Sequence, residues 1–263
     1  MDESKIERID LYSEILNKEM SILAYLPKNY DELDSLPVLY FFHGRTGCED
    51  IMLSLDIASK ADKMIESGEI KPIIIVCPRM DNSRGLNSAL NCEILINSND
   101  NRVMNLGRYE DYFINEIIPL IDKKFNTIKD RNSRYIGGVS AGGYIALHNI
   151  FRHIDMFSKV GGHMPALELK LEKDDELHYK EVGLWEKYNP IDIANQMTFD
   201  AEIQVYLDAG DEDEGNFFEG CAILNDILKE KNIDSQNYIF SGHHNEAYIK
   251  SNLEKYLKFY GND

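Results

Sequence analysis

One short pattern constrains the fold of this chain more than any other stretch. Residues 138–142 read Gly-Val-Ser-Ala-Gly, which places Ser140 between two glycines. Apolar residues before the pattern predict the end of a buried strand, and residues 143–147 predict the start of a helix. A serine on so tight a strand-to-helix turn takes strained backbone angles and points its hydroxyl into open space. Gly138 and Gly142 remove the Cβ atoms that would otherwise collide there.

Apolar runs and helical patterns alternate along most of the chain. A pair of antiparallel strands is expected within residues 6–26, and further strands are expected at residues 38–42, 73–77, 135–139, 159–162, 203–207 and 238–240. Helices are expected at residues 51–66, 109–121 with a kink at Pro119, 144–151, 222–231 and 246–260. This rhythm predicts an α/β fold, with helices on both faces of a mostly parallel central sheet. Because no linker or repeat interrupts it, we expect a single domain over residues 1–263.

Three connections carry candidate binding groups. His43-Gly44-Arg45 follows a strand at the sheet edge where α/β folds place their sites, although alone it is more typical of an ordinary strand-to-helix turn. Residues 79–101 form a long polar segment that can contact a substrate or be ordinary surface, and both interpretations stay open. Residues 164–200 are charged and long for a connection, which predicts a small helical insertion over the site.

The composition limits the partners of the chain. With 46 acidic and 28 basic residues, the net charge is −18, which argues against nucleic acid or an anionic membrane as a partner. The N-terminus shows no apolar signal segment, and no apolar run approaches the length of a membrane span. We therefore expect a soluble, cytoplasmic protein. Zinc-ligand spacing is absent from the four cysteines, which we expect to be free thiols: Cys48, Cys77, Cys92 and Cys221.

Residues that can activate a serine follow later strands. A serine hydroxyl needs a histidine as base, and the histidine needs an acid that holds its tautomer. In this type of fold the order along the chain is serine, acid, histidine. Three aspartates follow the strand at 203–207, namely Asp208, Asp211 and Asp213, and two histidines follow the strand at 238–240, namely His243 and His244. Asp208 has little reach at the strand end, whereas Asp213 lies beyond the turn, and His244 directly precedes the last predicted helix.

The acidic turn does not fit a calcium loop. An EF-hand that began at Asp211 would place Asn216 where glycine is needed and Ala222 where a bidentate glutamate is needed. The remaining alternative for Glu212 and Glu214 is a solvated acidic turn. We expect neither a metal nor a cofactor.

Taken together, these motifs resemble the esterase D and feruloyl esterase-like group of α/β-hydrolases. The resemblance covers nearly the whole chain and rests on Tyr25-Leu26-Pro27 with Tyr30, His43-Gly44, residues 109–119, residues 138–143, Gly210 with Asp213, and Gly242 with His244. It implies the α/β-hydrolase fold. It also implies that Ser140 is the nucleophile, Asp213 the acid and His244 the base.

The same resemblance implies an oxyanion hole made by two backbone N–H groups. One belongs to Ala141, directly after the serine, and the other to Arg45, directly after the His-Gly pair. Methionine is common in the family at the position of Ala141, so the pocket wall is smaller here. Arg45 is unusual at its position and places a cation at the mouth of the site.

The sequence thus predicts a serine carboxylesterase. We expect a small-molecule ester of the short-chain acyl, acetyl-sugar or feruloyl type to be hydrolysed through an acyl-enzyme. One alternative is an acyltransferase that uses the same triad. A second is a non-catalytic binding protein, since a fold does not fix a function.

Overall fold

The structure is a computed structural model that describes residues 3–97, 101–173, 175–180, 183 and 185–262. Its centre is an eight-stranded sheet with the order β1-β2-β4-β3-β7-β8-β9-β10. The strands are β1 (Lys5–Ser13), β2 (Lys18–Leu26), β3 (Val38–Phe42), β4 (Ile74–Pro78), β7 (Arg134–Val139), β8 (Lys159–His163), β9 (Gln204–Gly210) and β10 (Asp234–Phe240). β2 pairs antiparallel with β1 and β4, and the other neighbours are parallel. The mostly parallel sheet predicted from the sequence is confirmed.

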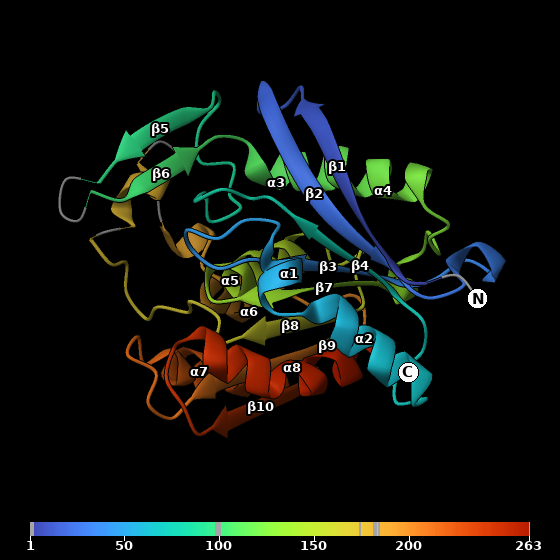
Figure 1. The fold of residues 1–263 in the computed structure, drawn as a ribbon. Helices are drawn as coiled ribbons and strands as arrows, with labels where there is room; N and C mark the ends of the chain where they lie inside the picture. The colour runs from blue at the N-terminus through green and yellow to red at the C-terminus, as the bar shows by residue number, and fades with distance from the viewer. Residues whose placement is uncertain (1–2, 98–100, 174, 181–182, 184, 263) are drawn as a thin grey trace.

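Helices cover both faces of this sheet (Figure 1). Leu39 and Phe41 of β3 pack on the face covered by α2 (Ile57–Glu66) and α8 (Glu246–Gly261), whereas Tyr40 packs on the opposite face. That opposite face is covered by α3 (Tyr109–Tyr112), α4 (Ile118–Lys124), α5 (Ala141–Arg152), α6 (Pro190–Gln196) and α7 (Phe217–Glu230). Continuous apolar strands are expected when both faces are buried, which is why the sequence revealed β3 and β4 so clearly.

Two predicted helices are interrupted. The helix expected at residues 51–66 is divided into α1 (Ile51–Ser54) and α2, because Asp56 takes left-handed backbone angles with φ 54°. The kink expected at Pro119 takes the form of a π-helical turn, Phe113–Ile117, between α3 and α4. A wide turn tolerates the missing N–H of a proline better than a regular helix does.

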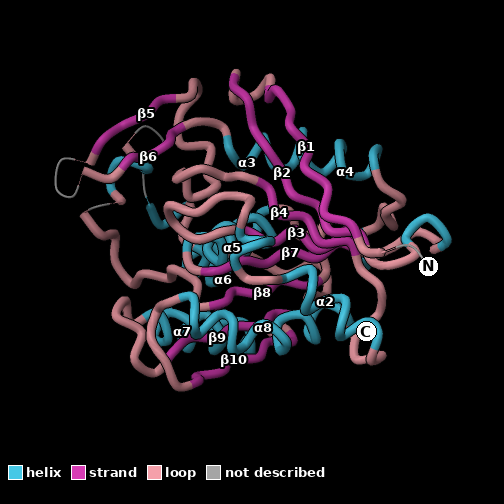
Figure 2. The backbone as a smooth tube through the Cα atoms, viewed as in Figure 1, coloured by secondary structure: helices cyan, strands magenta, loops and turns pink. Residues whose placement is uncertain are grey.

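The two long segments also fold. Residues 79–101 lead into a small antiparallel hairpin of β5 (Glu93–Ile96) and β6 (Val103–Leu106), which projects from the main sheet (Figure 2) and was not predicted. The described part of residues 164–200 contains α6 and two short 3₁₀ turns, Glu176–Tyr179 and Trp185–Lys187, as expected for a small helical insertion. A further 3₁₀ turn lies at Tyr30–Glu32 and another at Arg131–Ser133.

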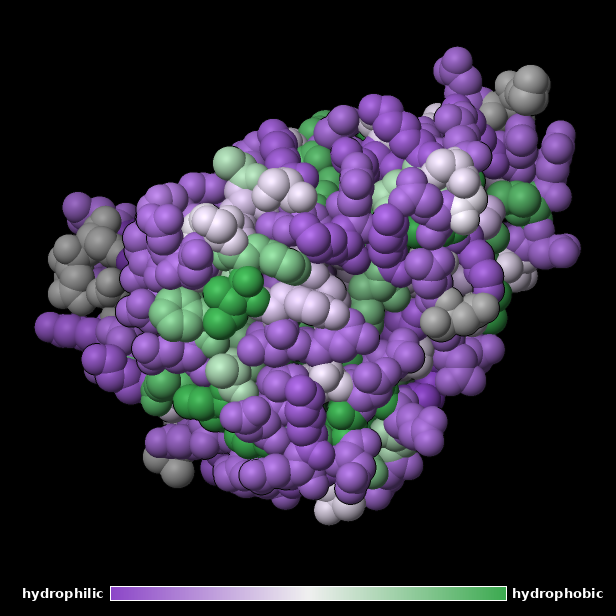
Figure 3. Space-filling view, turned by 90° about the horizontal axis from the view of Figure 1, so that it is seen from below, coloured by the Kyte–Doolittle hydropathy of each residue, from purple (hydrophilic) through white to green (hydrophobic). Residues whose placement is uncertain are grey.

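The surface is rich in polar residues. The face seen in Figure 3 is mostly hydrophilic, and its hydrophobic residues form small groups. In the described ranges no helix is both long and apolar enough to cross a membrane. All four cysteines are free thiols: Cys77 and Cys221 are buried, Cys48 is half-buried and Cys92 is exposed.

Candidate active site

Ser140 occupies a strained turn between β7 and α5. Its backbone angles are φ 54° and ψ −119°, in a region that residues with a side chain rarely adopt. A Cβ on Gly138 would lie 2.6 Å from the carbonyl of Gly142, and a Cβ on Gly142 would lie 2.3 Å from the oxygen of Phe42. Both glycines are therefore required by the close approach of the turn to β3, as the sequence predicts.

Neighbouring backbone holds this turn in place. The N–H of Ser140 donates to the carbonyl of His163 at the end of β8, with an N–O distance of 3.0 Å. The carbonyl of Ser140 in turn accepts from the N–H of Ala166, also at 3.0 Å. The strain at Ser140 is thus supported by the adjacent strand and by the segment that follows it.

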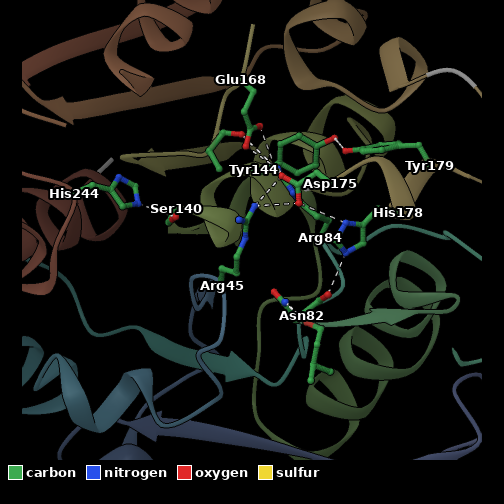
Figure 4. Close-up of polar contacts among 12 residues, drawn as sticks. Arg45, Asn82, Arg84, Ser140, Tyr144, Glu168, Asp175, His178, Tyr179 and His244 are labelled. Carbon is green, nitrogen blue, oxygen red and sulfur yellow. Dashed lines mark hydrogen bonds and ion pairs between the residues drawn. The ribbon is translucent and has the colours of Figure 1, made fainter. Parts of the chain in front are cut away.

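Ser140, His244 and Asp213 form a continuous chain of hydrogen bonds. The Oγ atom of Ser140 lies 2.9 Å from Nε2 of His244, and Nδ1 of His244 lies 2.8 Å from Oδ2 of Asp213. Figure 4 shows the Ser140 hydroxyl and the His244 ring facing each other. Because a carboxylate only accepts, Nδ1 carries the proton and Nε2 is left to accept the serine proton. The second oxygen of Asp213 accepts from the N–H of Gly215 at 2.8 Å, which fixes the carboxylate.

The other candidate acids and the other histidine have different partners. Asp208 is fully buried and contacts His163 and two tyrosine hydroxyls, not His244. Asp211 accepts a hydrogen bond from the N–H of Gly242. His243 is about half exposed and contacts the backbone and side chains of the acidic turn. Asp213 is therefore the one of the three aspartates that reaches His244.

The two expected oxyanion donors lie beside the serine. Ala141 is the first residue of α5, and Arg45 lies in the loop after β3; both line the same cavity as Ser140. A Cβ on Gly44, next to Arg45, would lie only 3.4 Å from the Cβ of Ser140, so this loop runs against the turn. Within the described part of the chain, neither amide N–H is used in a hydrogen bond.

His43 anchors the loop that carries Arg45. Its Nε2 accepts from the N–H of Met80 at 3.0 Å, and its Nδ1 donates to the carbonyl of Gly44 at 2.8 Å. These two partners require the neutral ring with the proton on Nδ1. Burial also lowers the pKa of His43, which favours the same neutral form. The sequence indicated this residue only as part of a motif, and its structural role becomes visible through its partners.

A cavity of about 1190 Å³ opens in front of Ser140. It lies at the carboxyl ends of the parallel strands, where the sequence predicted the site. Part of its wall is apolar and consists of Ile51, Leu55, Met164, Ala166, Leu167, Phe217 and Ile249. The ring of Phe217 packs edge-on against the ring of His244, with centroids 5.1 Å apart. This wall can receive an apolar group next to the serine.

Polar groups from both long segments complete the site. Glu168 and Asp175, from the segment after β8, line the cavity, and Arg84, from the segment after β4, binds both of them. Buried Arg84 supports the cavity wall from behind and is not one of the residues that line it, so it does not decide between the two interpretations of residues 79–101. No sequence pattern indicated these contacts, since the partners lie 84 and 91 residues apart.

The remaining histidines have structural partners. His148 is fully buried between Glu110 and the carbonyl of Tyr188, and His153 contacts Glu110 at 2.8 Å. Among the described residues there is no group of three or more histidine, cysteine or acidic side chains that could hold a metal ion.

Comparison with known proteins identifies relatives of the chain. The family model described as putative esterase matches residues 13–260. An endo-1,4-beta-xylanase/feruloyl esterase from Xylanibacter ruminicola is 29% identical over 84% of this chain and 29% of its own length. An endo-1,4-beta-xylanase Y from Acetivibrio thermocellus is 24% identical over 56% of this chain and 13% of its own length. The chain therefore spans less than a third of either of these two curated relatives.

Solved structures show the same fold. A ferulic acid esterase has a TM-score of 0.83 at 22% identity, with 99% of both chains covered. The S-formylglutathione hydrolase FrmB from Staphylococcus aureus has a TM-score of 0.78 at 17% identity, with 99% of this chain and 100% of that chain covered. The fold is accordingly the α/β-hydrolase fold, as the sequence resemblance implied. With the family model matched from residue 13 to residue 260, the chain belongs to the putative esterase family.

Proposed function

We propose that the protein is a serine carboxylesterase that hydrolyses small-molecule esters. The observation that carries the proposal is the hydrogen-bonded chain from Ser140 through His244 to Asp213 beside two unused amide N–H groups. Family membership and a relative named as a feruloyl esterase support it. The proposal requires no metal or cofactor, because the serine, its base and the oxyanion donors all come from this chain.

In the proposed mechanism the ester carbonyl enters the cavity with its oxygen toward the amides of Arg45 and Ala141. His244 takes the proton from Ser140 as the serine oxygen attacks, and the two amides stabilise the negative charge on the former carbonyl oxygen. His244 then gives its proton to the departing alcohol, which leaves an acyl-enzyme. A water molecule that His244 deprotonates releases the acid and restores the serine. Asp213 keeps the ring oriented throughout.

The cavity supports an ester with an apolar acyl or aryl part. Met164, Leu167 and Phe217 provide apolar surface next to Ser140. We therefore propose an ester of the feruloyl type, or one with a short acyl chain longer than acetyl, ahead of an acetylated sugar. An acetyl group would leave most of this apolar surface uncovered. Acyl transfer to an alcohol by the same residues and ligand binding without catalysis are the alternatives.

The direct test uses p-nitrophenyl acetate and a fluorophosphonate probe. We expect a burst of p-nitrophenol from the wild type and labelling of Ser140 by the probe. Ser140→Ala should abolish both and lower kcat by roughly 10³-fold or more while the protein remains folded. Stoichiometric labelling of a different serine would contradict the assignment, and the absence of both burst and labelling would favour a binding protein. Faster p-nitrophenol release with added alcohols would favour acyl transfer.

The two adjacent histidines provide a matched pair of variants. His244→Ala should reduce kcat about as much as loss of the serine, because the two residues act as one unit. His243→Ala should leave kcat within about threefold of the wild type, since an exposed side chain away from the serine contributes little to the chemistry. The opposite pattern in kcat would assign the base to His243.

A further inference from the structure

A buried carboxylate joins the expected oxyanion loop to the insertion after β8. Nη2 of Arg45 lies 2.8 Å and 3.1 Å from the two carboxylate oxygens of Asp175, although the residues are 130 positions apart in the sequence. The Asp175 side chain is only 6% exposed, and the Arg45 side chain is 29% exposed. Figure 4 shows Asp175 between the guanidinium groups of Arg45 and Arg84, within reach of both.

Arg84 fixes the carboxylate from the opposite side. Its Nη2 also contacts Asp175, and its guanidinium binds Glu168 through two hydrogen bonds of 2.6 Å and 3.2 Å. The same group lies over the ring of Tyr144 in α5, 4.8 Å from the centroid. The two positive charges of the arginines balance the two negative charges of the carboxylates, which offsets the cost of removing these groups from water. The paired hydrogen bonds also fix their relative orientation. Asp175 is thus bound by two arginines at the edge of the cavity.

The loop that carries Arg45 otherwise has few constraints near that residue. His43 holds it on the side of β4, and one turn hydrogen bond of 3.1 Å joins the N–H of Gly47 to the carbonyl of Gly44. Thr46 has left-handed backbone angles with φ 62°. At the far end of the loop Glu49 bonds Ser21, Arg8 and Arg79, so Arg45 lies between two anchored ends. Surface loops generally move more than the sheet they follow. An oxyanion donor stabilises a transition state only if it is already oriented when the charge develops.

We propose that the Arg45–Asp175 ion pair is a positioning device for the oxyanion hole. Asp175, backed by Arg84, restrains the side chain of Arg45 and thereby keeps the Arg45 amide N–H directed toward the oxygen of the tetrahedral intermediate. This inference rests on the proposed esterase function and adds to it a role for the insertion after β8. Asp175 and Arg84 act through Arg45 and do not touch the reacting atoms.

The test removes the Arg45–Asp175 ion pair and keeps the backbone N–H of residue 45. Arg45→Ala retains the backbone N–H, and Asp175→Asn removes the partner charge. For each variant we expect kcat to fall by about 10-fold, less than the roughly 10²-fold or more lost with a whole donor, and KM to stay within about twofold. The kcat of the double variant should equal that of the less active single variant, because both changes remove the same interaction. Arg45→Lys should recover part of kcat.

A transition-state analogue separates positioning from stability. A trifluoromethyl ketone forms a hemiketal oxyanion on the serine, so its affinity should fall by about the same factor as kcat/KM. Lys258→Ala, which removes the exposed ion pair with Glu69 away from the cavity, is the control and should change neither value. The melting temperature and the burst amplitude report the folded, active fraction of each sample.

The outcomes are distinct. If Arg45→Ala and Asp175→Asn lower the melting temperature but keep wild-type kcat per active site and wild-type ketone affinity, the pair is only structural and the inference is wrong. Should Asp175→Asn fail to fold, Arg45→Ala decides alone, because its side chain is partly exposed. A wild type that shows neither burst nor labelling of Ser140 would instead overturn the proposed function, and this inference with it.

Discussion

Asp208, Asp211 and Asp213 show how strongly the environment of a single residue decides its role. Asp208 lies in β9, and Asp211 and Asp213 follow that strand, so all three fall within six residues, yet only Asp213 among them contacts His244. We expect Asp213→Asn to reduce kcat by roughly 10⁴-fold, because an amide in that place can favour the wrong tautomer of the histidine. Asp211→Asn should cost only a few-fold, since an exposed carboxylate with one backbone hydrogen bond contributes modestly. Measurement of kcat for both variants, with melting temperatures, checks the order.

The small cost expected for Asp211 has a structural reason. Its carboxylate accepts from the N–H of Gly242, two residues before His244. The neutral amide of asparagine accepts more weakly, so the substitution loosens the turn that presents the base. A collapse of kcat in Asp211→Asn with Asp213→Asn near the wild type would show that the acid has been assigned to the wrong aspartate.

At the scale of elements, Glu49 joins the loop after β3 to three other segments. Its buried carboxylate accepts from Ser21 of β2 at 2.6 Å, from Arg8 of β1 at 2.8 Å and from Arg79 after β4 at 2.8 Å. Burial alone would raise the pKa of Glu49, but the hydrogen bonds from Ser21, Arg79 and Arg8 outweigh it and lower the pKa to about 2. Glu49 therefore fixes the far end of the loop that begins at His43.

This lowered pKa makes a prediction about acid stability. The ionised form of Glu49 stabilises the folded state fully above the ordinary glutamate value of about 4.5, and this contribution is lost as the pH falls toward about 2. Glu49→Gln should thus lower the free energy of unfolding by about 2 kcal/mol at pH 7. Urea unfolding at pH 7 and pH 3 should show that the difference in free energy of unfolding between variant and wild type is smaller at pH 3. A gap that widens on acidification would contradict the assignment.

The elements differ in how far the sequence could predict them. β3 and β4 are buried on both faces, so a run of five apolar residues in the sequence predicts each strand. The glycines around Ser140 predict the tight turn. The division of the first helix at Asp56 and the hairpin β5–β6 depend on backbone angles and pairings that no periodic pattern shows. Within the site, the family motif predicted the residues that contact one another. The Arg45–Asp175 pair was out of reach because its partners are 130 positions apart.

At the scale of the whole molecule, charge should influence which esters reach the serine. The net charge is −18, and the described residues that line the cavity include seven acidic side chains against two basic ones. The acidic residues are Asp50, Glu168, Glu172, Asp175, Glu214, Glu219 and Glu246, and the basic ones are Arg45 and Lys170. Arg45 and Arg84 balance Asp175 and Glu168, which leaves five acidic side chains and Lys170 around the cavity. An anion that approaches the cavity therefore meets a negative field, both at long range and at the rim.

This field predicts discrimination against anionic esters. The p-nitrophenyl ester of valerate and the p-nitrophenyl monoester of succinate are similar in length, but the second carries a carboxylate. At about 10 mM salt we expect kcat/KM for the succinate ester to be roughly 10-fold lower or more, because repulsion slows encounter and weakens binding. At about 1 M salt the screening length falls from roughly 30 Å to 3 Å, so the ratio should shrink. At low salt, Lys170→Ala should increase the ratio of kcat/KM for the valerate ester to kcat/KM for the succinate ester. A succinate ester that reacts faster than the valerate ester, with an advantage lost in Lys170→Ala, would show that the rim cation binds the substrate and that the acidic side chains do not govern selection.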